Sequence, residues 1–151
     1  MKAWDDEDWR EPGDNRWARG CRWLQSRWRE VELGLEPGPR NAADPDRLVC
    51  SMLPFNADRS ANFLSPEAHA AAEALLARGT GSGIVDDDRL LRNLLSSQPT
   101  CVNLFGPFVA NPDGLTEWVR SLDPECAQVT EVRLEWAPPR AEHFDGGSAF
   151  S

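Results

Sequence analysis

Two groups of polar side chains in this sequence have the types and the spacing from which chemistry can be built. The first is a string of amides and hydroxyls at residues 93–98, which includes Asn93, Ser97 and Gln98 and joins a leucine-rich segment to the apolar string CVNLFG. Buried amides and hydroxyls need hydrogen-bond partners. The string is therefore a structural link between two segments or part of a binding site, and its composition favours the link.

The second group is the charged face Glu131, Arg133 and Glu135. On an extended strand, Glu131 and Glu135 would point to the same side, about 13 Å apart. That separation is too large for the two carboxylates to share one metal ion. We interpret the group as a solvated face and keep both glutamates, with Asn93, Ser97 and Gln98, as candidates of unknown role.

Other motifs give no complete reactive set. The string GTGSG at residues 79–83 lacks the Gly-Lys-Ser/Thr ending of a phosphate loop. The run Asp86, Asp87 and Asp88 fits a helix cap better than a metal site. The four cysteines are far apart without a CxxC spacing, which favours inert thiols over a zinc centre.

Four helices are expected to position these groups. In residues 16–34 the apolar side chains recur at steps of three and four and predict one buried stripe, with arginines on the other faces. The stripe comprises Trp17, Cys21, Leu24, Trp28 and Val31. Tryptophan and arginine can also stack on nucleic-acid bases, but the regular spacing favours burial.

The second helix is predicted from its termini, because Ser65 fits an N-cap, Pro66 the first helical position and Gly79 the end. A third helix is expected from Asp86 or Asp87 to about residue 98, and a fourth within residues 112–124. Residues 36–64 are proline-rich and are expected to be irregular.

Only near the end does the apolar period change to two. Val132, Leu134 and Trp136 alternate with charged residues, which is typical of a half-buried strand. A turn at residues 137–147 and a return strand at 148–150 are expected to follow. The sequence thus predicts an α+β fold with a mainly helical front part leading into the first strands of an incomplete mixed α/β core. Residues 1–15 are expected to form an acidic, poorly ordered arm and residues 16–151 the domain.

These strings, in this order, resemble a known family. NFLSPE, RLLRNLLSSQPTCVNLFGPF, VTEVRLEWAPPR and FDGGSAF are similar to the N-terminal portion of a restriction-endonuclease-like family of the PD-(D/E)XK nuclease superfamily. The similarity extends from about Asn62 to the end of the chain. It implies a restriction-endonuclease-like α/β core and phosphodiester hydrolysis in DNA.

In that superfamily an Asp and a Glu-x-Lys pair hold Mg²⁺ and position a water molecule. The resemblance places the metal-binding Asp directly after the segment like GGSAF, where this sequence has Ser151. The only lysine is Lys2. We therefore expect Mg²⁺ in the complete family member, no cofactor in this chain, and a chain that stops at the catalytic core and is inactive alone.

The charge limits the partners. A net charge of −9 disfavours a broad phosphate-binding face but leaves room for a local basic groove, so DNA is an expected partner only through the resemblance. The alternative is a non-catalytic binding or regulatory module that pairs an exposed strand edge with another chain, and the same unpaired edge could mediate self-association. No apolar run approaches the ~20 residues of a membrane span, and the acidic start is unlike a signal peptide. We expect a cytoplasmic location.

Overall fold

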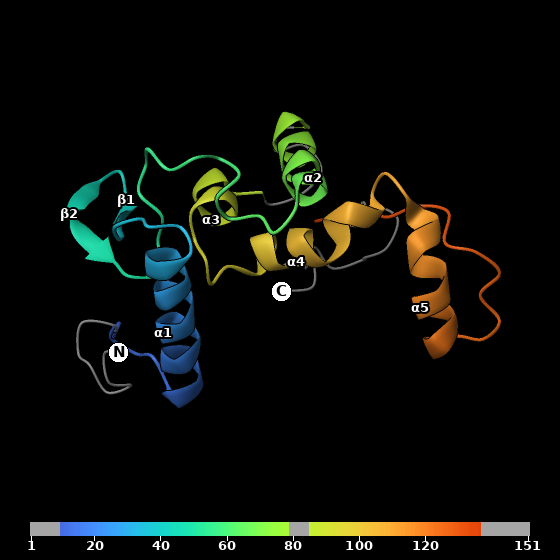
Figure 1. The fold of residues 1–151 in the computed structure, drawn as a ribbon, viewed down its shortest axis with the longest axis horizontal. Coiled ribbons are helices and arrows are strands. Elements are labelled where there is room, and N and C mark those ends of the chain that lie inside the picture. The colour runs from blue at the N-terminus through green and yellow to red at the C-terminus, as the bar shows by residue number, and fades with distance from the viewer. Residues whose placement is uncertain (1–9, 79–84, 137–151) are drawn as a thin grey trace, which may run out of the picture.

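A computed structural model describes residues 10–78 and 85–136 of the 151-residue chain. The elements are α1 (Arg16–Val31), β1 (Gly38–Asn41), β2 (Asp44–Val49), α2 (Pro66–Ala77), α3 (Asp87–Leu91), α4 (Ser97–Phe105), η2 (Gly106–Phe108), η3 (Pro112–Leu115) and α5 (Thr116–Leu122). In Figure 1, α1 and the two strands lie to one side, α2, α3 and α4 lie in the middle, and α5 lies at the opposite end. The predicted α+β class is confirmed. None of the described helices is long and apolar enough to cross a bilayer.

The first helix begins and ends close to its predicted bounds. The side chain of Asn15 accepts a hydrogen bond from the backbone N–H of Ala18 at 2.9 Å and caps the start of α1. The helix ends at Val31, and Gly34 follows with a φ of 63°. A glycine adopts this left-handed conformation without steric cost, which explains why the chain turns there.

The predicted buried stripe of α1 is wrong. Trp17 is 79% exposed and Leu24 60% exposed, whereas Ser26 and Arg29 are buried. The helix packs through a different face because the long arginine side chain reaches the backbone beyond β2. Nε of Arg29 donates to the carbonyl oxygen of Cys50 at 3.0 Å. Hydrogen bonds from Arg22 and Arg29 thus tie this helix to the segment after β2.

A β-hairpin follows α1 and forms the two-stranded sheet. Its antiparallel register pairs Gly38 with Val49 and Asn41 with Asp44. The side-chain oxygen of Asn41 accepts from the backbone N–H groups of Ala43 and Asp44, each at 3.0 Å. This asparagine therefore shapes the two-residue turn between the strands.

The prediction that residues 36–64 are irregular is wrong for the hairpin. Pro39 and Pro45 lie in its strands, and five of the six residues of β2 are exposed. The hairpin therefore lacks the alternation of apolar and polar residues by which a half-buried strand is recognised. Gly38 has a steric role: a Cβ atom there would lie 2.1 Å from the carbonyl oxygen of Leu53. Only glycine allows the hairpin to approach the following loop so closely.

The apolar core lies between α2, α3 and α4. Its buried members are Ala68, Ala71, Ala72, Leu75, Leu90, Val102 and Leu134. Helix α2 has the predicted start, since Ser65 accepts from the N–H of Ala68 at 3.1 Å. A Cβ atom at Gly106 would lie only 3.1 Å from Cα of Ala68. Small side chains thus let these helices pack closely.

The predicted third helix is split in two. After α3 ends at Leu91, the N–H of Leu94 donates to the carbonyl oxygen of Ser51 at 3.0 Å, and Met52 and Asn93 form an isolated antiparallel bridge. This pairing with the loop after β2 interrupts the helix. A new helix, α4, then starts at Ser97 and continues over most of the apolar string CVNLFG.

The fourth predicted helix is present as η3 followed by α5. Leu115 is buried, whereas Trp118 and Leu122 are 54% and 69% exposed. The ring of Trp118 lies 6.3 Å from that of Phe105 in α4. The helix therefore contacts the rest of the structure at its start and leaves its far end in solvent.

The predicted strand in residues 128–136 is wrong. Leu134 is buried in the core and Val132 packs against it, as their alternation suggests, but Trp136 is 53% exposed and the backbone is irregular. Glu135 has a φ of 50°, which breaks an extended conformation. Among the described residues, the core of α2, α3 and α4 buries Leu134 and contacts Val132 without a neighbouring strand. The predicted turn and return strand lie outside the described residues, and the domain limits stay predictions.

Candidate functional site

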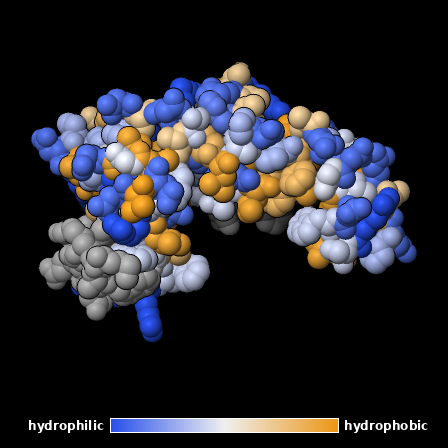
Figure 2. Space-filling model, viewed as in Figure 1, coloured by the Kyte–Doolittle hydropathy of each residue, from blue (hydrophilic) through white to orange (hydrophobic). Residues whose placement is uncertain are grey.

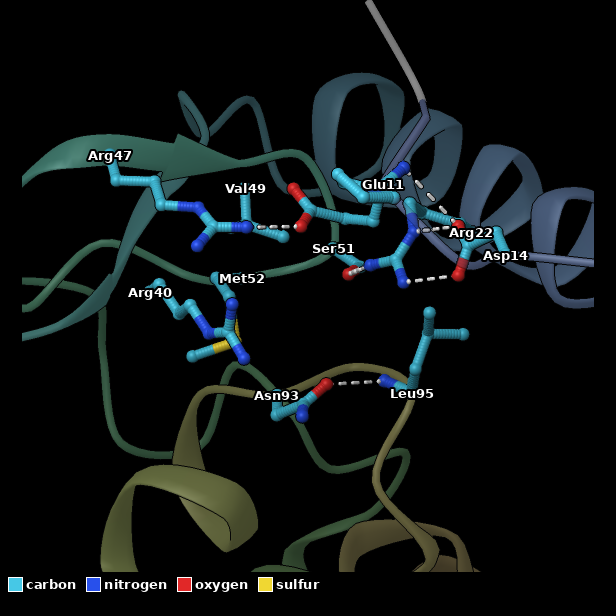
Figure 3. Close-up of a pocket in the computed structure, with 11 residues that line it drawn as sticks. Glu11, Asp14, Arg22, Arg40, Arg47, Val49, Ser51, Met52, Asn93 and Leu95 are labelled. Carbon is cyan, nitrogen blue, oxygen red and sulfur yellow. Dashed lines mark hydrogen bonds and ion pairs between the residues drawn. The ribbon is translucent and has the colours of Figure 1, made fainter.

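A cavity of about 510 Å³ opens between the start of α1, the hairpin and the loops at residues 51–52 and 93–95. Figure 3 shows three arginines extending toward it from three different elements. Arg22 comes from α1, Arg40 from β1 and Arg47 from β2. Residues that are 25 positions apart in the chain thus meet because the hairpin folds back beside the helix.

Arg22 is held firmly in place. Its Nε and Nη2 atoms donate to the two carboxylate oxygens of Asp14 at 2.7 and 3.0 Å, and Nη1 donates to Oγ of Ser51 at 2.6 Å. The hydrogen bond from Arg22 lowers the pKa of Asp14 below its ordinary range, although partial burial opposes this shift. The same bond raises the pKa of Arg22. This two-point contact is the strong form of an arginine–carboxylate pair.

Arg47 makes a looser contact. Its Nη2 donates to one carboxylate oxygen of Glu11 at 2.8 Å, and the two side chains are 41% and 21% exposed. The backbone N–H of Glu11 in turn donates to Asp14 at 3.4 Å. One short segment ahead of α1 therefore supplies both carboxylates in the cavity.

Arg40 is different from both. It is exposed, points into the cavity in Figure 3, and has no hydrogen bond or ion pair within the part of the chain that the structure describes. Together, three positive and two negative side chains line the cavity, which leaves one net positive charge. This is a local basic groove on a chain whose total charge is −9. Planar guanidinium groups match the oxygens of a phosphate, so the arrangement suits an anion.

The structure brings only one predicted site residue to this cavity. Asn93 lines it, and its Oδ1 atom accepts from the N–H of Leu95 at 3.0 Å (Figure 3). Ser97 is the exposed first residue of α4, after the cap Ser96. Buried Gln98 accepts from the N–H of Asp86 at 3.4 Å, which fits the structural-link interpretation of this string.

The two glutamates lie elsewhere. Glu131 accepts from Nε of Arg133 at 2.7 Å, and both side chains are more than half exposed. Glu135 lies near Cys101, whose pKa is raised first by burial and then by this carboxylate. The structure therefore does not bring the five predicted residues together in one site, and their role stays a prediction.

Sequence reasoning missed Arg22, Arg40 and Arg47. The available signal was composition, because arginine occurs 15 times and lysine once. Composition does not say which arginines converge. That information depends on the hairpin, whose exposed strands carry no recognisable pattern.

A second hollow of about 410 Å³ lies between α1 and α4. Leu24, Trp28, Leu64 and Leu104 are among its lining residues, and none of the lining side chains is charged. Figure 2 shows apolar side chains gathered over the middle of the molecule, where α4 lies. This groove therefore offers mainly apolar surface and no positively charged side chain.

Comparison with known proteins identifies the family. A family model described as PD-(D/E)XK nuclease superfamily matches residues 12–151, which is nearly the whole chain. The chain therefore belongs to the PD-(D/E)XK nuclease superfamily. No curated protein and no solved structure matches significantly.

Nucleases of this superfamily are expected to use Mg²⁺ bound by carboxylates. Within residues 10–78 and 85–136, no three His, Cys, Asp or Glu side chains come together in a way that could hold a metal ion. Glu131, for example, is engaged by Arg133. The described residues therefore do not fit the ion.

Proposed function

We propose that this chain belongs to a Mg²⁺-dependent DNA nuclease system of the cytoplasm, that it binds DNA through the arginine cavity, and that it does not cleave DNA by itself. The family match supports the nuclease relationship. The observation that carries the DNA-binding part is the convergence of Arg22, Arg40 and Arg47 on one cavity. Arginines on separate elements can contact successive phosphates of a nucleic-acid backbone.

The charge distribution supports a local contact. A chain with a net charge of −9 repels DNA over most of its surface. Attraction therefore has to come from a cluster in which positive side chains outnumber negative ones, as they do here. Such a contact fixes position on the duplex without reading its sequence.

The proposal that the chain does not cleave rests on its residue types. A Glu-x-Lys pair needs a lysine two positions after a glutamate, and the sequence contains no lysine at that spacing from a glutamate. No three His, Cys, Asp or Glu side chains of the described residues could hold a metal ion, and arginines engage carboxylates such as Asp14 and Glu131.

Two assays on the purified chain test this proposal. Fluorescence anisotropy with a labelled DNA duplex, repeated over a series of salt concentrations, should give a log K against log salt slope of about −2 to −3, because each neutralised phosphate contributes about −0.9. A supercoiled plasmid incubated with Mg²⁺ should stay supercoiled. Salt-independent binding would contradict the first part, and a nicked or linear plasmid would contradict the second.

The alternative is a binding module that pairs a strand edge with another chain. The strand predicted in residues 128–136 is not formed, but β1 and β2 make a sheet of only two strands, so each has one edge unpaired within the described part of the structure. Open edges can add a strand from a partner. Size-exclusion chromatography separates the two functions, since this alternative requires association of the chain without DNA.

A further inference from the structure

The two bound arginines of the cavity are held by carboxylates from one short segment. Asp14 engages Arg22, and Glu11 engages Arg47, within four residues just before α1 (Figure 3). Arg40, from the neighbouring strand β1, has no such carboxylate among the described residues. The acidic segment thus occupies two of three sites that could each take a phosphate.

The geometry of these pairs resembles phosphate binding. Asp14 presents two oxygens to the fork of Arg22, as a phosphate does in a two-point contact. Glu11 presents one oxygen to Arg47. Because a carboxylate and a phosphate need the same donors, both cannot hold the same face of one guanidinium group at the same time.

We propose that the carboxylates of Glu11 and Asp14 act as an internal substitute for DNA phosphates. The DNA backbone must displace both carboxylates before it can contact all three arginines. This inference rests on the proposed DNA-binding function and adds a mechanism that limits it. Binding starts at Arg40, whose side chain has no carboxylate partner among the described residues. It proceeds to Arg47 by displacing Glu11 and last to Arg22 by displacing Asp14.

The order follows from exposure. The Glu11–Arg47 pair is 21% and 41% exposed, so water and salt screen it and it separates easily. The Asp14–Arg22 pair is 11% and 14% exposed and has two hydrogen bonds, with a third from Arg22 to Ser51. The more exposed pair, Glu11–Arg47, is therefore the one whose removal changes DNA affinity without disturbing the fold.

The experiment compares Glu11→Gln with Glu30→Gln. Glu30 also accepts from an arginine at 2.8 Å, Arg27, but on the exposed surface of α1 away from the cavity lining. Both substitutions remove one negative charge and release one exposed arginine. The probe is the same labelled DNA duplex, and the readout is its dissociation constant for the whole chain.

We expect Glu11→Gln to bind DNA about fivefold more tightly than the wild-type chain, the upper end for releasing an exposed ion pair. Glu30→Gln should change affinity less than about twofold. If the two variants gain DNA affinity equally, the change in net charge alone explains the effect and the substitute mechanism is overturned. The proposed DNA binding would still stand in that case. If neither the wild-type chain nor any variant binds DNA, the proposed function fails and takes this inference with it.

Asp14→Asn gives a second, independent variant. Asparagine keeps one acceptor oxygen for Arg22 but loses the charge, so it should also tighten DNA binding, with unfolding curves confirming that the chain is folded. A double variant with Glu11→Gln should bind more tightly than either single variant. A folded double variant with wild-type affinity would overturn the proposal.

Discussion

Two regions of this chain are stabilised by different interactions. Around α1 and the hairpin, arginines bridge elements by donating to carbonyl and carboxylate oxygens, as Arg22, Arg29 and Arg92 do. Around α2 and α4, alanine, leucine and valine side chains pack with little polar content. The comparison shows that one small fold can place a charged cavity beside an ordinary apolar core. In the first region, arginines both hold the elements together and give the cavity its positive charge.

The largest effect is expected at Arg92, which joins the parts of the arginine-rich region. Its guanidinium donates to the carbonyl oxygens of Leu53 at 3.0 Å and Pro39 at 2.6 Å and to Asp88 at 2.8 Å, and it stacks 3.7 Å over the ring of Phe55. Arg92→Ala should lower the free energy of unfolding by about 4 kcal/mol in urea denaturation, because buried acceptors lose their donors.

Arg92→Lys is the matched control. It keeps the charge but lacks the planar fork, so it should recover less than half of the loss. Full recovery by lysine would mean that charge, and not the directed hydrogen bonds of the guanidinium, holds this region together.

The second prediction concerns the apolar region. Leu90 is completely buried in the core, so Leu90→Ala should cost about 3 kcal/mol through lost burial and the cavity left behind. Leu90→Met preserves volume and should cost less than about 1.5 kcal/mol. The contrast with Arg92 is the test: a conservative replacement should be tolerated in the apolar region and not in the arginine-rich one.

The two regions also differ in how far the sequence predicts them. Helix α2 was predicted with its cap because Ser65 and Pro66 are local signals and alanine favours a helix. The buried face of α1 was predicted wrongly because periodicity counts apolar residues, whereas Arg29 is the residue that packs. An arginine with buried acceptors has the same sequence signature as one in solvent.

The candidate site was less predictable than the fold. Asn93 was chosen as a polar residue at a helix end and does line the cavity. The arginines were not chosen, since their meeting depends on a hairpin whose strands are exposed and contain prolines. Leu134 was placed inward correctly, yet its strand was wrong, because burial of one side chain does not require a strand when helices supply the contact.

The smallest stability effect is expected at Asp14. Asp14→Asn weakens the charged pair with Arg22 and should cost about 1 to 2 kcal/mol at neutral pH. The folded-state pKa of Asp14 is lowered, so its contribution is complete above the unfolded pKa of about 4 and is lost as the pH falls through the folded value. The stability difference between wild type and Asp14→Asn, measured by urea denaturation, should therefore shrink on acidification. A difference that is constant with pH would contradict the role of the carboxylate.

The most direct test of the central claim, that the arginine cavity binds DNA phosphates, is the salt dependence of DNA binding by Arg40→Gln beside Arg89→Gln. Both arginines are exposed, neither side chain has a hydrogen-bond or ion-pair partner among the described residues, and of the two only Arg40 lines the cavity. We predict that Arg40→Gln weakens binding and reduces the magnitude of the slope of log K against log salt by about 1, while Arg89→Gln leaves the slope unchanged. Equal slopes for the two variants would contradict the account.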